Sequence, residues 1–311
     1  MISLPVIGAF AGIYIVWGTT YLAMAIAIQT VPPFISGAAR FLLAGALMYG
    51  WLRLRVPSPL AGINMFGAAL CGVLLTGIGN GLVIWSQQGI PSGIVALVVT
   101  AMPVIVLVLD WAFFSKRAPT AQGLAGTAIA IAGVATIIVH TRSLSGDAHP
   151  LHLIALMVAI CGWSIGTLMQ KRYATIDNVL SFTCAQLLFG GLFQLSMSIA
   201  NKEWIGFEVS HVSLASILAV AYLIVFGTLI ALNCYLWLLT HVPAQKVTTY
   251  ALVNPVVALI LGAIVLNERI TWLAMVAALL VLAGVALVLF QDWSPVDLWR
   301  RQQRKRIAVG G

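Results

Sequence analysis

Charged residues are scarce in this sequence, and their scarcity excludes a soluble globular protein. Only 8% of the 311 residues are Asp, Glu, Lys or Arg, whereas 61% are hydrophobic and the mean hydropathy is +1.05. Soluble domains carry about 25% charged residues. Apolar stretches of about 20 residues, long enough to cross ~30 Å of hydrocarbon, recur along the whole chain. The sequence therefore predicts an integral membrane protein that lies in a lipid bilayer.

Paired cysteines and alternating strands are also missing. The four cysteines, Cys71, Cys161, Cys184 and Cys234, lie singly inside apolar stretches without CxxC spacing. That placement favours packed thiols over disulfides or a metal site. Barrel strands would alternate polar and apolar residues over about 10 positions, and the long apolar runs do not. We therefore expect an all-α integral membrane protein that holds no metal and no cofactor.

Hydropathy predicts ten membrane spans. They cover residues 5–28, 33–52, 62–86, 91–113, 120–140, 150–170, 177–200, 211–239, 243–266 and 270–290. The opening segment MISLPVIGAF lacks a positively charged start and merges into the first span. We therefore expect no cleavable signal.

Lysine and arginine predict the orientation of these spans. With the N-terminus inside, 11 of the 16 basic residues lie in inside segments and three lie in outside loops. This bias satisfies the positive-inside rule and predicts that both termini are cytoplasmic, in a chain of the plasma (inner) membrane. The net charge of +8 then gives no sign of nucleic acid. We expect the basic tail RRQQRKR at 300–306 to face anionic lipid rather than a specific partner.

The sequence contains an internal repeat, which explains why proline twice interrupts an apolar run. At an offset of 152 residues, the matched pairs are Trp85 with Trp237, Pro91 with Pro243, Pro103 with Pro255, and Arg117 with Arg269. At an offset of 146, Trp17 matches Trp163, and FISGAARFLLAGAL at 34–47 matches LSFTCAQLLFGGLF at 180–193. The longer loop around NKEWIGFEVSH absorbs the difference between the two offsets.

Each repeat holds five spans, so the second copy must enter the membrane from the opposite side. Inverted repeats are typical of transporters, in which the two halves surround a site near the midplane. We expect ten transmembrane helices in two inverted five-helix repeats around a central cavity. Residues 1–145 form the first repeat, 146–292 the second and 293–311 a basic cytoplasmic tail. Because one chain already supplies both units, we expect a functional monomer.

Three segments carry a resemblance to a known family. They are IVWGTTYLAMAIAIQTVPPFISGAARFLLAGAL at 15–47, GNGLVIWSQQGIPSGIVALVVTAMPV at 79–104 and ALVNPVVALILGAIVLNERITW at 251–272. They resemble the EamA branch of the drug/metabolite transporter superfamily, and the likeness covers nearly the whole chain. The resemblance implies ten helices in two inverted units and export of amino acids or other small metabolites, with exporters of aromatic and other neutral amino acids among the nearest subgroups.

One departure from that superfamily matters for mechanism. Its small four-helix relatives carry a glutamate in the first helix that couples cation efflux to protons. The first span of this chain has no acidic residue. The drug–proton mechanism of those relatives is therefore not carried over.

Polar and aromatic side chains inside the spans are the candidates for substrate binding. The set is Trp17, Tyr21, Asn80, Trp85, Trp163, Asn233, Tyr235, Trp237, Tyr250 and Asn254. A buried amide costs several kcal/mol when it is unpaired, so Asn80 and Asn233 must bond another helix, water or a ligand. Trp17 and Trp163 sit deep in their spans, where ring faces can stack on an aromatic or cationic ligand. The alternative is that such rings act as interfacial anchors.

Pro103 and Pro255 are the candidate hinges. Each proline leaves the carbonyl four residues earlier, at Val99 and Ala251, without its usual helical partner. Such carbonyls are tolerated in a membrane where they face a water-filled cavity. We therefore expect the fourth and ninth spans to bend at these prolines.

Charges inside the spans are the sparsest class. Arg40 lies in the second span, Asp110 near the inner end of the fourth, and Lys246 near the start of the ninth. We assign these three residues a possible charge role, with snorkelling to the interface as the alternative for Lys246. Because no acid lies clearly at mid-membrane, facilitated export of small neutral or zwitterionic metabolites is favoured over proton-coupled multidrug or metabolite antiport.

Two rival functions have weaker support. GWSIG at 162–166 formally matches the GxSxG elbow of hydrolases. That elbow needs a strand-to-helix turn with a histidine in reach, whereas this match lies in an apolar helix. A passive channel is the second rival, because NPV at 254–256 is similar to the asparagine–proline pairs of water channels. The other repeat reads MPV and lacks the asparagine. A transporter that is not an enzyme is therefore the favoured interpretation.

Overall fold

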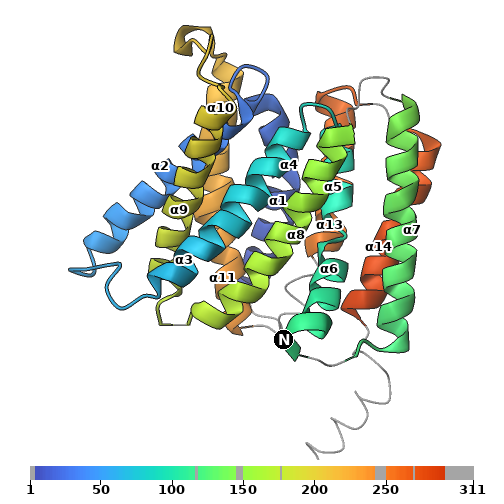
Figure 1. Cartoon of the computed structure of the whole chain (residues 1–311), viewed down its shortest axis with the longest axis horizontal. Helices are drawn as coiled ribbons and strands as arrows, with labels where there is room; N and C mark the ends of the chain where they lie inside the picture. The colour runs from blue at the N-terminus through green and yellow to red at the C-terminus, as the bar shows by residue number, and fades with distance from the viewer. Residues whose placement is uncertain are drawn as a thin grey trace, which may run out of the picture.

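The computed structural model describes residues 4–115, 118–144, 150–175, 177–241, 250–268 and 270–290. Within these ranges every regular element is a helix, and there is no strand. Figure 1 shows a single bundle of long, roughly parallel or antiparallel helices. The prediction of an all-α protein is confirmed.

The first repeat supplies five spans. They are α1 (Leu4–Ala27); α2 (Pro33–Arg53); α3 (Met65–Cys71), η1 (Gly72–Asn80) and α4 (Gly81–Ser86); α5 (Ser92–Val99), α6 (Met102–Leu109) and η2 (Asp110–Ser115); and α7 (Ala121–Leu144). The third and fourth spans each consist of three consecutive helical segments. In the third, a π-helical stretch connects two α-helices.

The second repeat supplies the other five spans. They are α8 (Pro150–Tyr173); α9 (Val179–Ala200); α10 (Leu214–Tyr222), η4 (Leu223–Ile230) and α11 (Ala231–His241); α13 (Tyr250–Val265); and α14 (Trp272–Leu289). A short 3₁₀ turn, η3 (Val209–His211), lies in the loop before α10. Within the described ranges, eight helices are long and apolar enough to cross a membrane, and Ala121–Thr136 and Tyr250–Val265 are shorter apolar helices. These ten correspond to the ten predicted spans.

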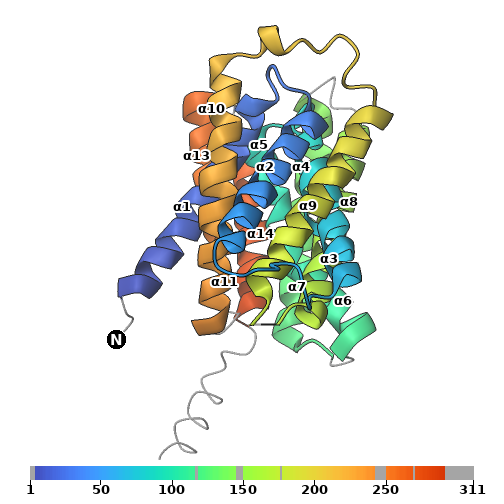
Figure 2. The same ribbon diagram turned by 90° about the vertical axis from the view of Figure 1, so that its left-hand side faces the viewer.

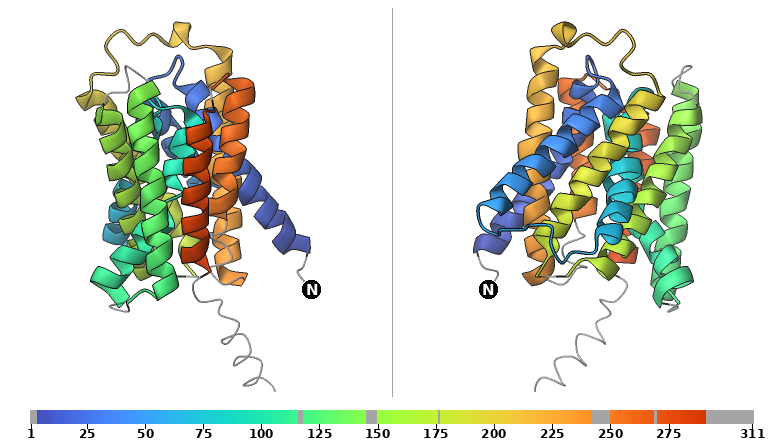
Figure 3. Two further views of the ribbon diagram at one scale, coloured as in Figure 1. Left: turned by 90° about the vertical axis from the view of Figure 1, so that its right-hand side faces the viewer. Right: turned by 60° about the vertical axis from the view of Figure 1, so that its left-hand side comes forward.

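The two repeats run in opposite directions. In Figure 1, α1 rises from the end of the bundle where the N-terminus is marked, whereas α8 descends from the opposite end. The beginning of α1 and the end of α14 lie at the same end of the bundle in both panels of Figure 3. An even number of crossings in two inverted five-helix units is therefore the architecture of the described chain.

The repeats interleave rather than standing as separate bundles. Equivalent spans pack directly on each other: α2 on α9, α7 on α14, and α5 on α13. Figure 2 shows α2 beside α9, and the left panel of Figure 3 shows α7 beside α14. The first span of each repeat also packs against the other repeat. Helix α1 contacts α10, α11 and α13, and helix α8 contacts η1, α4 and α6. Each half therefore completes the packing of the other.

Glycines allow the closest of these approaches. A Cβ atom built on Gly126 of α7 would lie 2.6 Å from the carbonyl oxygen of Gly284 in α14, and one on Gly284 would lie 2.5 Å from the carbonyl oxygen of Gly126. Small residues at such crossings let helix backbones meet in lipid, where van der Waals packing drives association. The outward faces carry the large apolar side chains instead, such as Leu192, Ile264 and Leu279, as a lipid-facing surface requires.

The two long π-helical stretches occupy equivalent places in the repeats. Residues 72–80 of η1, shifted by the repeat offset of 152, overlap the range Leu223–Ile230 of η4. Such stretches are rare and are frequent at functional sites. Both repeats therefore keep a wider helical turn in the middle of their third span.

The two candidate hinges differ in the structure. In the first repeat the α-helix ends at Val99, a turn follows at Thr100 and Ala101, and Pro103 stands in the first turn of the new helix α6. In the second repeat, Pro255 lies inside the continuous helix α13. Pro103 thus follows a break in the fourth span, whereas Pro255 lies in an unbroken helix of the ninth span.

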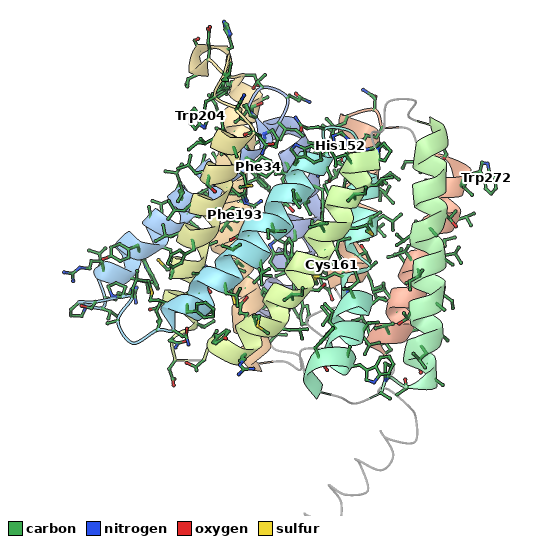
Figure 4. The ribbon with its side chains drawn as sticks, viewed as in Figure 1. Phe34, His152, Cys161, Phe193, Trp204 and Trp272 are labelled. Carbon is green, nitrogen blue, oxygen red and sulfur yellow. The ribbon has the colours of Figure 1, made fainter. Side chains whose placement is uncertain are left out.

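Glutamates cap two helix starts at the end of the bundle opposite the N-terminus. The Glu203 carboxylate accepts hydrogen bonds from the backbone N–H groups of Phe34 (3.2 Å) and Ile35 (2.9 Å) in the first turn of α2. The Glu268 carboxylate does the same for Ser92 and Gly93 at the start of α5. Phe34 and Trp204, which follows Glu203, are labelled near this end in Figure 4. Carboxylates are favoured there because the first N–H groups of a helix lack partners and carry partial positive charge.

Candidate functional site

A cavity lies between the first, second, third, fourth, sixth and ninth spans. It contains about 620 Å³ of space not filled by atoms, part of which is open to the outside. Its lining residues are Trp17, Thr20, Tyr21, Met24, Arg40, Asn80, Val83, Val99, Thr100, Met102, Trp163, Tyr250, Ala251 and Asn254. The lining combines aromatic and apolar side chains with a few polar groups, as is typical of small-molecule sites.

The lining follows the internal symmetry of the chain. Trp17 and Trp163 are matched by the offset of 146, and both line the cavity. Val99 and Ala251 are matched by the offset of 152, and these are the residues whose carbonyls lose a partner to Pro103 and Pro255. The cavity therefore lies where the two inverted repeats face each other.

Arg40 is a lining residue that carries a full positive charge. Only 6% of its surface is exposed, and a guanidinium stays protonated in proteins. Its Nε donates to Thr228 Oγ1 at 3.0 Å, and its Nη1 donates to Asn80 Oδ1 at 3.4 Å. Thr228 lies in η4 and Asn80 ends η1. The two π-helical stretches, one from each repeat, therefore hold the guanidinium between them.

Among the described residues, no carboxylate lies within ion-pair distance of Arg40. The ion pair that these residues do form joins His211 and Glu208, at 3.5 Å. The residue matched to Arg40 by the repeat is Gln186, which is buried and is not among the lining residues. The charge of the cavity is therefore asymmetric although its tryptophans are symmetric.

Trp17 is fixed in place by contacts from three elements. Its Nε1 donates to the carbonyl oxygen of Gly227 in η4 at 3.1 Å. Its ring centroid lies 4.9 Å from that of Tyr250 and 5.2 Å from that of Tyr235. The two tyrosine rings meet edge to face at 6.0 Å. Contacts of this kind hold Trp17 as a rigid wall of the cavity.

Asn254 contributes the second amide of the lining. In the orientation that satisfies its surroundings, its amide nitrogen donates to the carbonyl oxygens of Tyr14 (3.1 Å) and Tyr250 (3.2 Å). The amide oxygen of a cavity-lining asparagine can accept a hydrogen bond from an ammonium or hydroxyl group of a ligand.

Six of the ten predicted substrate-binding residues line the cavity. They are Trp17, Tyr21, Asn80, Trp163, Tyr250 and Asn254. Arg40, predicted to have a charge role, lines it as well. Tyr235 lies behind the wall, where it packs on Trp17 and Tyr250.

Other predicted site residues lie elsewhere. Trp85 stacks on His152, with ring centroids 4.5 Å apart and an interplanar angle of 24°; Figure 4 places His152 near the start of α8, at the end of the bundle that holds the two glutamate caps. The Asn233 amide nitrogen donates to the carbonyl oxygen of Leu229 one turn earlier on the same span. Asp110 is the first residue of η2 and is not a lining residue.

Two predicted residues fall outside the described parts of the structure. They are Lys246 and the side chain of Trp237.

The sequence interpretation missed two lining threonines. The hydroxyl of Thr20 donates to the Trp17 carbonyl at 2.6 Å, and that of Thr100 donates to the Ala96 carbonyl at 2.9 Å. A hydroxyl that bonds its own helix is common in membrane spans, so residue type gave no signal. The position of Thr100 did give a signal, because this residue lies three residues before Pro103 and hence beside the break in the fourth span.

The GxSxG match does not form a nucleophile elbow. Ser164 lies inside α8, fully buried, and its Oγ has no hydrogen-bond partner among the described residues. An elbow would instead need an exposed hydroxyl on a strand-to-helix turn.

Comparison with known proteins identifies the family. The model of the EamA-like transporter family matches residues 4–139 and again residues 150–290. The chain belongs to the EamA-like transporter family. It is also 33% identical, over 276 residues, to the uncharacterized inner membrane transporter YedA of Escherichia coli strain K12, covering 88% of this chain and 87% of that protein. This EamA-family chain is therefore a membrane transporter.

More distant relatives agree with this assignment. The protein is 29% identical to protein PagO of Salmonella typhimurium, over 92% of this chain and 93% of that one. It is 25% identical to a probable amino-acid metabolite efflux pump of E. coli strain K12, over 89% and 92% of the two chains. A solved crystal structure superposes with a TM-score of 0.62 at 17% identity, covering 90% of this chain and 94% of that chain. That structural likeness supports the fold.

Proposed function

We propose that this transporter exports small zwitterionic or neutral metabolites, chiefly amino acids with aromatic or apolar side chains, by alternating access. The observation that carries the proposal is the cavity between the inverted repeats, in which two symmetric tryptophans accompany one buried arginine. Tryptophan faces suit an apolar or aromatic side chain, and a guanidinium suits a carboxylate. A relative that is 25% identical is named as a probable amino-acid metabolite efflux pump, which supports the same substrate class.

We propose that export is uncoupled from protons. Coupling to protons needs a group in the transport path that gains and loses one. The lining residues within the described parts of the chain include no Asp, Glu or His. Proton-coupled multidrug or metabolite antiport is the second candidate function, and this composition of the lining disfavours it.

We also propose that both termini are cytoplasmic in the plasma membrane and that residues 1–145, 146–292 and 293–311 act as two repeats and a tail in a functional monomer. The common end shared by the start of α1 and the end of α14 supports the first part. The interleaved contacts between the repeats support the last part, because one chain completes its own cavity.

A transport assay in proteoliposomes tests these proposals. Vesicles are loaded with each of a panel of amino acids, amines and organic cations, and efflux is followed with and without a pH gradient. We expect saturable amino-acid efflux that is accelerated by the same substrate on the far side and is unchanged by the gradient. Flux linear in concentration would indicate a channel. Efflux that needs a pH gradient, or that is confined to organic cations, would replace the proposal with the antiport alternative.

A further inference from the structure

We propose that the guanidinium of Arg40 binds the carboxylate of the substrate, so that the cavity selects amino acids over the corresponding amines, amides and esters. The inference rests on the proposed function, because it takes this cavity as the substrate site. It adds the group on the ligand that is recognised and the residue that recognises it. Three observations carry it: the unused donors of Arg40, the glycine that makes room for the guanidinium and the missing counter-charge.

Arg40 has donors to spare. A guanidinium carries five N–H donors in a planar fork. The structure uses one at Nε, with Thr228, and one at Nη1, with Asn80. The other Nη1 hydrogen and both Nη2 hydrogens have no partner among the described residues. Because Nε is occupied, the edge formed by Nη1 and Nη2 is the one left for a ligand, and a carboxylate fits such an edge with two parallel hydrogen bonds.

A glycine lets the Arg40 guanidinium lie close to the backbone of η4. A Cβ atom built on Gly227 would lie 3.3 Å from Arg40 Nη2 and 3.1 Å from Thr20 Cγ2. The carbonyl of the same glycine accepts the hydrogen bond from Trp17 Nε1. Gly227 therefore fixes Trp17 with its backbone and leaves room for the guanidinium where a side chain would stand.

The missing counter-charge makes the site selective. A buried cation without an anionic partner is costly in a low-dielectric interior, and ionisable residues inside membrane spans usually serve a function. An entering carboxylate supplies the counter-charge that the described residues do not. For an ammonium group the described lining residues instead offer neutral acceptors, such as the Asn254 oxygen, and ring faces. Recognition of the carboxylate should therefore dominate affinity.

The second repeat supplies a matched reference. At the position equivalent to Arg40 it carries Gln186, which is 4% exposed, so glutamine fits this helix position in the same fold. Arg40→Gln is therefore the principal variant. Arg53→Gln is its control, because Arg53 is an exposed cation at the end of the same helix.

The test measures competition for export of labelled phenylalanine by the full chain in proteoliposomes. Unlabelled phenylalanine and its desamino analogue 3-phenylpropionate should compete within a few-fold of each other. Phenethylamine and phenylalanine amide should compete about 10- to 100-fold more weakly, equivalent to about 1.4–2.8 kcal/mol. Arg40→Gln should raise KM for phenylalanine by a similar factor and abolish the preference for carboxylates, whereas Arg53→Gln should leave both unchanged.

Several outcomes would overturn the proposal. Equal competition by phenethylamine and phenylalanine in the wild type would do so without any variant, which keeps the test valid if Arg40→Gln fails to fold. If Arg40→Gln leaves KM and selectivity unchanged, the proposed role of Arg40 is wrong, whereas the proposed export of amino acids is not affected. If phenylalanine is not exported at all, the proposed function fails first. Ligand-induced thermal stabilisation by 3-phenylpropionate, seen in the wild type and lost in Arg40→Gln, would then still support the carboxylate site.

Discussion

Ser92 and Glu268 meet across the two repeats at the end of the bundle opposite the N-terminus. Glu268 Oε1 accepts hydrogen bonds from the Ser92 backbone N–H at 2.7 Å and from its hydroxyl at 2.8 Å. By the offset of 152, the residue equivalent to Glu268 is Lys116, and the one equivalent to Ser92 is Ala244. A lysine cannot accept hydrogen bonds from a helix start. The sequence therefore allows this contact, which we call the Ser92–Glu268 clasp, at one end of the bundle only.

Glu268→Gln should weaken that clasp. The amide keeps one accepting oxygen but loses the charge that interacts with the start of α5, so we expect a loss of about 1–2 kcal/mol in stability. The measurement is Tm in detergent. Ser92→Ala should lower Tm less, because both backbone donors remain. If the clasp also closes this end of the cavity, Met102→Cys should react faster with an impermeant thiol reagent when it is combined with Glu268→Gln. Equal Tm and equal labelling would show that the clasp is dispensable.

Glu203 should give stability a measurable pH dependence. Burial raises the pKa of this carboxyl above its ordinary value of 4.5, and the hydrogen bonds from Phe34 and Ile35 lower it only in part. The folded chain therefore binds the proton more tightly than the unfolded chain. The resulting stabilisation is present below the unfolded pKa and is lost as the pH rises through the folded pKa.

The Tm of the wild type, relative to that of Glu203→Gln, should accordingly rise when the pH is lowered from about 7 to about 4. Asp177→Asn, at an exposed carboxylate near the opposite end of the bundle, serves as the control for general acid effects. A relative Tm that falls on acidification would mean that the backbone hydrogen bonds outweigh burial at Glu203.

Pro103→Ala and Pro255→Ala should slow transport more than they reduce the amount of folded protein. Alanine restores the donor that proline removes and lets the carbonyls of Val99 and Ala251 return to helical pairing. The fourth span, which is broken before Pro103, should change more than the continuous α13. Turnover per folded molecule in proteoliposomes measures the effect. Unchanged turnover in both variants would remove the hinge assignment.

Gly37→Ala should destabilise the bundle. A Cβ atom at this position would overlap Oε1 of Gln194, a fully buried side chain of α9 whose amide nitrogen donates to the Thr76 carbonyl at 2.6 Å. Overpacking of this kind costs about 1–3 kcal/mol or more. Gly50→Ala on the same helix is the control, because a Cβ there meets nothing within 4 Å. Comparable Tm values for the two variants would contradict the packing of α2 on α9.

The sequence predicted the fold well because hydropathy and duplication are long-range signals. The ten spans, their inversion and a cavity between the repeats all follow from apolar run lengths and from an odd number of spans per copy. Trp17 and Trp163 were found because they are deep in their spans and also matched by the repeat. Those two conditions together select residues near the axis that relates the two inverted repeats.

Single residues were harder to place. Asn80 and Asn233 were both predicted to bind substrate because each is an amide in the third span of its repeat. The offset of 152 matches Asn80 with residue 232 instead, and a shift of one residue turns a helical side chain by about 100°. Asn233 therefore bonds its own helix. Trp85 met the repeat criterion, but its ring stacks on His152, a contact that no local pattern announces. The π-helical stretches were also unpredicted, because they depend on tertiary packing.

Arg40 is the one cation among the described lining residues, and it makes the proposed substrate path different in the two repeats. In a dimer of identical five-helix units, each side chain would appear twice, and two facing guanidinium groups would repel each other across a small chamber. Fusion of the copies lets one hold Arg40 and the other Gln186. The carboxylate of a bound zwitterion would then point towards the first repeat throughout the transport cycle. The substrate would not need to rotate in the cavity before its release on the other side of the membrane.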